Sequence, residues 1–160
     1  MQHIDIIAVG RLREPFLRDG VSEYLKRLRP FARVRILEGP EEKIPEPLPP
    51  TRARQILAAE GEGIMRLIRP GAYIIALDRE GTMLTSEELA GRLGDLALAG
   101  RSNLTFIIGG TLGLDPGVLE AAHLRLSFSR LTFPHQLMRL ILLEQLYRAF
   151  KILSGEPYHR

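Results

Sequence analysis

Hydrophobic residues occur in this chain in two patterns, and each predicts a different element. Short, mostly apolar runs lie at 4–9, 34–37, 72–77, 104–108 and 124–128 and predict strands. The run at 72–77 is continuously apolar, which is typical of a strand buried on both faces of a parallel sheet. Apolar residues at helical spacing predict helices over 15–29, 51–69, 86–98 and 136–153. Strand and helix therefore alternate. This order predicts an α/β fold, a mostly parallel sheet flanked by helices, within one domain spanning 1–160.

Local signals define several element boundaries. Thr85 or Ser86 is placed to cap the helix over 86–98, and Asp115 followed by Pro116 predicts the start of a further short helix. The stretch 39–50 contains prolines at 40, 45, 47, 49 and 50. We expect this stretch to be an extended, mobile loop.

The closing helix over 136–153 is apolar almost all round, and its one clean polar row consists of Glu144, Arg148 and Lys151. A helix of this kind is buried on several sides. Those sides belong either to the core of a monomer or to an interface with a second subunit. Of the two arrangements, we expect the homodimer.

Composition excludes several classes of protein. The apolar runs are short, as at 72–77, whereas a membrane-spanning helix needs about 20 apolar residues, so no membrane association is expected. The chain has no cysteine, which excludes disulfides, thiolate zinc sites and cysteine nucleophiles, and we expect no metal. The N-terminus carries Asp5 where a signal peptide would stay apolar, so a cytoplasmic location is expected.

The positive charge is carried mostly by arginine. The net charge is +3, and of 22 lysines and arginines only Lys26, Lys43 and Lys151 are lysines. The guanidinium fork suits phosphates and stacked bases, although GC-rich coding or a hot habitat also favours arginine. The two ends of the chain are the basic parts, and between them Glu38, Glu41, Glu42 and Glu46 form an acidic stretch.

Three segments carry residues suited to chemistry. Glycines at 109, 110 and 113 follow a buried strand, which suits either a tight turn or close approach to a ligand, but their spacing matches neither common phosphate-binding motif. The segment 127–135 combines hydroxyls and apolar residues that suit an adenine, and its His135 is either a base or a structural residue. In the tail, Tyr158, His159 and Arg160 can stack on a base, move protons and grip phosphate, unless the end frays.

Taken together, these motifs resemble a known family. The resemblance rests on four motifs: I-G-G-x-x-G-L from residue 108, L-S-F-S-R-L-T-F-P-H-Q from 126, E-Q-L-Y-R-A-F-K-I from 144 and the terminal P-Y-H-R. The chain is similar to the bacterial pseudouridine N3-methyltransferases of the large ribosomal subunit, which belong to the SPOUT class. The resemblance extends to Ile7–Arg11, Glu23–Arg27 and Ala76–Asp78, and it fades in the proline-rich stretch 39–50.

The resemblance implies a C-terminal trefoil knot, a homodimer, S-adenosylmethionine as methyl donor and 23S rRNA in the assembled ribosome as substrate. It implies a cofactor pocket formed by Leu77, Gly109, Gly110, Phe128, Ser129, Arg130, Leu131, Thr132 and Phe133. The catalytic residues would be His135 or His159 as base, with Tyr158 and Arg160 holding the nucleotide and its phosphate. The absence of cysteine is consistent with methylation of a ring nitrogen, which needs deprotonation and alignment rather than a nucleophile that adds to the ring.

Two other functions are compatible with parts of the pattern. A non-catalytic, ribosome-associated RNA-binding factor would keep the fold and lose the chemistry, but the intact glycine segment and the complete tail argue against it. A nucleotide-dependent enzyme of ordinary doubly wound fold would need one of the phosphate motifs that the glycine segment lacks.

Overall fold

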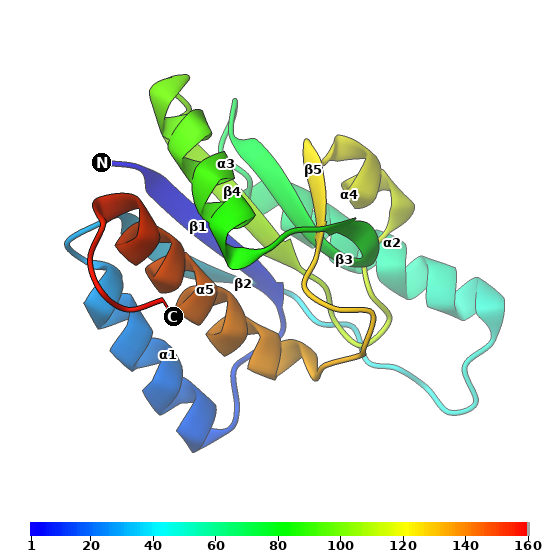
Figure 1. The fold of residues 1–160 in the computed structure, drawn as a ribbon. Coiled ribbons are helices and arrows are strands. Elements are labelled where there is room, and N and C mark those ends of the chain that lie inside the picture. The colour runs from blue at the N-terminus through cyan, green and yellow to red at the C-terminus, as the bar shows by residue number, and fades with distance from the viewer. Residues whose placement is uncertain (160) are drawn as a thin grey trace.

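The computed structural model describes residues 1–159 and consists of one five-stranded sheet with helices on both faces (Figure 1). The elements are β1 (His3–Val9), α1 (Pro15–Leu28), β2 (Arg33–Gly39), α2 (Pro50–Leu67), β3 (Tyr73–Met83), α3 (Ser86–Leu98), β4 (Asn103–Ile108), α4 (Pro116–Ala121), β5 (Leu124–Ser127) and α5 (His135–Ser154). The strands run in the order β2-β1-β4-β3-β5, and every pair is parallel. This confirms the predicted α/β fold.

Two hydrophobic layers cover the sheet because successive residues of a buried strand point to opposite faces. Ile6 and Phe106 are paired in register and point toward the layer formed by α1, α3 and α5. Ile7 and Ile107 are the next pair, and they pack on the other face with Ile64 of α2 and residues of α4. In Figure 1, α1, α3 and α5 lie on the near side of the sheet and α2 and α4 on the far side.

Helix α5 lies between α1 and α3 and packs against both (Figure 1). Its side facing the sheet and these helices is buried and consists of Arg139, Leu142, Leu143, Leu146, Ala149 and Phe150. Packing within one chain therefore buries much of the apolar surface of this helix. The homodimer stays a prediction.

Most element boundaries follow the local signals. Thr85 caps α3 through a capping box in which its side chain accepts from the Glu88 amide, and Asp115 caps α4. The proline-rich loop is slightly shorter than expected, because β2 continues to Gly39 and α2 begins at Pro50.

Strand β3 is longer than the apolar run 72–77 indicates. Its pairing with β5 shifts register between Leu77 and Thr82, so the polar residues between them form a bulge. Gly81 permits this bulge, since a Cβ at that position would lie 2.5 Å from the carbonyl oxygen of Arg125. The pattern missed the extension because a polar bulge has no strand periodicity.

Candidate active site

A cavity of about 770 Å³ opens at the carboxyl ends of β3, β4 and β5. Three segments that are far apart in sequence surround it: the bulge of β3, the glycine loop after β4, and the segment that joins β5 to α5. Its lining consists of Leu77–Glu80, Ile108–Leu114, Leu119, Leu126, Phe128, Ser129, Leu131–His135 and Met138. Carboxyl ends of parallel strands are where ligands bind in open α/β sheets.

The glycine loop after β4 is closed by backbone contacts. The Gly113 amide donates to the Gly110 carbonyl over 3.1 Å, and the two residues form an isolated antiparallel bridge. A Cβ on Gly109 would lie 2.4 Å from the Gly113 carbonyl oxygen, and Gly113 itself has a φ of +89°. Both positions therefore require glycine. The result is a tight loop that forms one wall of the cavity, in which Gly109, Gly110 and Gly113 contribute backbone and Thr111 and Leu112 lie between them.

The segment after β5 is held in a compact turn. The Ser129 hydroxyl accepts from the Leu131 amide over 2.9 Å, and the Ser127 hydroxyl donates to the Ser129 carbonyl over 3.2 Å. From the β3 bulge, Arg79 Nη1 donates to Thr132 Oγ1 over 2.6 Å. This bond links two walls of the cavity.

The structure brings together all but one of the residues predicted for the cofactor pocket. Those that line the cavity are Leu77, Gly109, Gly110, Phe128, Ser129, Leu131, Thr132 and Phe133. Arg130 is exposed and does not line it. Several further lining residues were not predicted for the pocket. Asp78, Arg79 and Glu80 are among them because the strand was predicted to end before them, and Met138 because it belongs to the apolar pattern of α5.

His135 is the first residue of α5 and lies in the cavity wall. Burial lowers the pKa of His135 below its usual 6.5, the nearby charges of Arg139 and Arg13 lower it further, and Glu41 partly opposes them. The lowered pKa of His135 favours the neutral imidazole at pH 7. A neutral imidazole can accept a proton from a group bound in the cavity.

The other predicted catalytic residues lie elsewhere in the chain. Tyr158 Oη donates to Glu144 over 2.9 Å and lies 3.5 Å from Tyr24 Oη, while His159 contacts Arg148 and Glu87. Tyr158 and His159 are thus packed on the outer side of α5, and neither lines the cavity. Arg160 lies outside the described residues.

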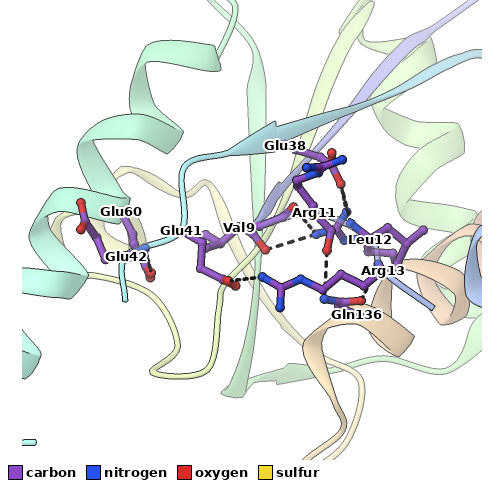
Figure 2. Close-up of polar contacts among 11 residues, drawn as sticks. Val9, Arg11, Leu12, Arg13, Glu38, Glu41, Glu42, Glu60 and Gln136 are labelled. Atoms are coloured by element: carbon purple, nitrogen blue, oxygen red, sulfur yellow. Dashed lines mark hydrogen bonds and ion pairs between the residues drawn. The ribbon is translucent and has the colours of Figure 1, made fainter. Parts of the chain in front are cut away.

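A buried arginine supports the wall beside His135. Arg139 is only 1% exposed, and its guanidinium donates to Glu38 over 2.6 Å and to the carbonyls of Val9 and Gly10. Glu38 also accepts from the Leu12 amide over 2.8 Å (Figure 2). Burial alone raises the pKa of Glu38, but these hydrogen bonds outweigh burial and lower it.

The same corner contains a second set of contacts between the loop after β1 and its neighbours. Arg13 pairs with Glu41 over 3.3 Å, and its amide donates to Gln136 of α5 over 3.0 Å (Figure 2). The start of α5 is therefore tied to the loops that follow β1 and β2. Sequence analysis did not identify this network, because its partners are up to 130 positions apart.

Two negative observations concern residues 1–159. No helix in this range is long and apolar enough to cross a membrane. No group of three or more His, Asp or Glu side chains in the same range is arranged to hold a metal ion.

Comparison with known proteins gives consistent results. The profile of a family described as "Predicted SPOUT methyltransferase" matches residues 2–159. A protein of Moorella thermoacetica named ribosomal RNA large subunit methyltransferase H is 68% identical over 100% of both chains. A protein of the same name from Carboxydothermus hydrogenoformans is 54% identical over 98% of this chain and 99% of its own. Among solved structures, a probable methyltransferase from Bordetella pertussis superposes with a TM-score of 0.57 at 13% identity, covering 93% of this chain and 95% of that one.

Proposed function

Because the chain belongs to the SPOUT methyltransferase family, we propose that it methylates large-subunit ribosomal RNA with S-adenosylmethionine as the methyl donor. The family also implies the C-terminal trefoil knot. The observation that carries the proposal is the cavity at the carboxyl edge of the sheet, formed by the three segments that the resemblance assigns to the cofactor.

The cavity suits this cofactor in size and in chemistry. Its volume of about 770 Å³ lies within the range of roughly 300–1,000 Å³ that is typical of small-molecule sites. Leu77, Leu126 and Phe133 provide apolar walls for an adenine, and the glycine loop offers backbone groups. Asp78 and Glu80 are carboxylates suited to hydroxyl or ammonium groups.

For the reaction, we propose transfer of the methyl group to N3 of a pseudouridine in 23S rRNA. The bound cofactor supplies an electrophilic methyl group on a positively charged sulfur. The chain has to hold the ring nitrogen in line with that methyl group and to accept the imide proton. Neutral His135 is in the cavity wall and is our candidate for the proton acceptor.

The tail requires a different arrangement if it takes part in the reaction. Within one chain, Tyr158 and His159 are bound to residues of α3 and α5, outside the cavity. We therefore propose that the active form is a homodimer in which the tail of one subunit completes the site of the other. Phe16, Leu131 and Leu153 are among the exposed large apolar residues that such an interface could cover.

Recognition of the ribosome would rely on shape and phosphate contacts made by the arginine-rich N-terminal part. Such binding weakens steeply as salt rises. Salt-insensitive binding to ribosomes would contradict this part of the proposal. A ribosomal substrate would also be consistent with the cytoplasmic location that we propose.

Calorimetry with S-adenosylmethionine tests the cofactor, and mass spectrometry of 23S rRNA from cells lacking the protein tests the product. We expect heat of binding in the first experiment and loss of one methylated pseudouridine in the second. A non-catalytic factor would give neither result. Light scattering tests the dimer, and a solitary chain at every concentration would refute it.

Two variants test whether His159 and the rest of the tail take part in the reaction. His159→Ala should lower turnover only if the tail enters the site, and unchanged turnover would remove His159 from the mechanism. Deletion of 158–160 should abolish methylation and leave cofactor affinity intact. A deletion that also abolishes cofactor binding would show that the tail is structural.

A further inference from the structure

Helix α2 carries a buried carboxyl group that the proposed reaction does not use. Glu60 is 4% exposed, and its Oε2 accepts a hydrogen bond from the Glu42 amide over 3.1 Å (Figure 2). Its other oxygen, Oε1, faces the glycine loop and lies 3.4 Å from the position that a Cβ on Gly110 would take. Glu60 does not line the cavity itself.

The residues that follow Glu60 bring the same turn of α2 close to both loops. A Cβ on Gly61 would lie 3.0 Å from Cβ of Asp115, at the end of the glycine loop. A Cβ on Gly63 would lie 2.6 Å from Pro40, at the start of the 40–49 loop. The sequence E-G-E-G at 60–63 thus permits contact that larger residues would prevent, and Glu60 is the polar group at the centre of that contact.

From this geometry we infer that Glu60 is a positioning residue, which holds the glycine loop in the shape that binds the cofactor. It acts through Gly110 and through the 40–42 segment, and not by touching the ligand. The inference rests on the proposed function, since it assumes that S-adenosylmethionine binds in the cavity beside Gly110.

The surroundings of Glu60 make a buried carboxyl group energetically unfavourable at this position, which indicates that the group has a specific role. Burial raises the pKa of Glu60, the negative charges of Glu41 and Glu42 raise it further, and the hydrogen bond from the Glu42 amide lowers it in part. If Glu60 only filled space, an apolar side chain of similar size would do the same without the free-energy cost of burying a carboxyl group. A group that must accept a hydrogen bond from a loop cannot be replaced in that way.

The test compares Glu60→Ala, Glu60→Gln and the matched control Glu62→Ala, whose side chain is exposed on the same helix. Calorimetry measures the affinity for S-adenosylmethionine. We expect Glu60→Ala to weaken it about tenfold, because one partner of a buried hydrogen bond is lost. The Gln variant keeps an oxygen acceptor and should stay within about threefold of the wild type, and the control should be unchanged.

Two further readouts distinguish positioning from general stability. Steady-state kinetics of Glu60→Ala should show a raised KM for S-adenosylmethionine, with a much smaller change in kcat. Hydrogen exchange without cofactor should accelerate at the amides of Glu42 and Gly113, whose bonds define the two loops. If Glu60→Ala does not fold, Glu60→Asp replaces it, because its shorter reach loses the same contact.

The outcomes separate the inference from the function on which it rests. Equal cofactor affinity of wild type and Glu60→Ala overturns the inference and leaves the function intact. Absence of binding by the wild type overturns the proposed function, and hydrogen exchange then decides whether Glu60 holds the loop. Loss of affinity in the Gln variant as large as in the Ala variant also contradicts the inference.

Discussion

The polar groups at the two ends of the parallel sheet have different surroundings. Near the amino ends of the strands, Asp5 is 2% exposed and is bound by Arg35 over 2.6 and 3.0 Å and by Arg69 over 3.1 Å. At the same end of the sheet, just before β5, His123 stacks on Tyr73 and accepts from the Ile74 amide. Asp5 and His123 are thus bound to other groups of the protein, whereas the buried Thr105 hydroxyl, in register with Asp5 on β4, has no partner among the described residues.

At the carboxyl ends, by contrast, the strands are followed by glycines, a bulge and a turn around a cavity. His135, Asp78 and Glu80 face that cavity. The difference indicates that Asp5 and its arginines serve stability, whereas the polar residues that line the cavity can meet a ligand. Substitutions at the two ends should therefore affect different measurements.

The largest effect is expected for Gly109→Ala. Its Cβ would lie 2.4 Å from a backbone oxygen of Gly113, so the loop cannot keep its shape. Calorimetry should detect no binding of S-adenosylmethionine. The control is Gly91→Ala in α3, which has open space around it and should change neither affinity nor folding adversely. Normal cofactor binding by Gly109→Ala would show that the glycine loop is not the binding element.

Replacement of His135 should act on the chemical step. We expect His135→Gln to lower kcat about 100-fold, which is typical of losing a general base, and to leave cofactor affinity nearly unchanged. Wild-type activity should fall as the pH drops through the lowered pKa of His135, below 6.5. His123→Gln at the opposite end is the control, and equal kcat losses in both variants would contradict the contrast between the ends.

At the amino end, Asp5→Ala should reduce the free energy of unfolding by about 2 kcal/mol, because two arginines lose a buried partner but remain partly hydrated. Urea denaturation measures this change. Glu23→Ala removes an exposed pair with Arg27 and should leave the free energy of unfolding nearly unchanged. Cofactor affinity should not change in either variant, and a large loss of affinity in Asp5→Ala would mean that the ends are coupled.

Acid should weaken the folded state partly through the same carboxylate. Burial alone raises the pKa of Asp5, but the hydrogen bonds and charges of Arg35 and Arg69 outweigh it and lower the pKa below its usual 3.8. The folded state therefore binds fewer protons, and this contribution is complete above the usual pKa and is lost as pH falls through the lowered one. Asp5→Asn should flatten the unfolding free energy against pH in that range, and an unchanged curve would refute the assignment.

The smallest effect is expected for Arg79→Ala, which removes the bond between the β3 bulge and Thr132. Arg79 is exposed, so we expect folding to be unaffected and the affinity for S-adenosylmethionine to fall by about threefold. Thr132→Val breaks the same bond from the other side. Unequal losses in the two variants would show that Arg79 contacts the cofactor itself.

Local sequence patterns predicted most of the helices and strands, and the family resemblance predicted many of the residues that line the cavity. The mostly apolar run at 104–108 forms a buried strand as predicted, and Thr85 and Asp115 cap their helices as expected. The resemblance placed Gly109, Gly110 and Phe133 around one pocket, and they line one cavity. It also grouped Arg130 with them, although this side chain lies outside the lining.

The amino-acid sequence alone determined the alternation of strand and helix, because buried runs, helical stripes and caps are properties of neighbouring residues. Only the tertiary structure decided that the bulge at 78–81 forms a wall of the cavity, that Arg139 supports Glu38, and that Glu60 lies beneath Gly110. These contacts join residues far apart in the chain. Their distances depend on how the strands pair and how closely helices can approach, and no local periodicity carries that information.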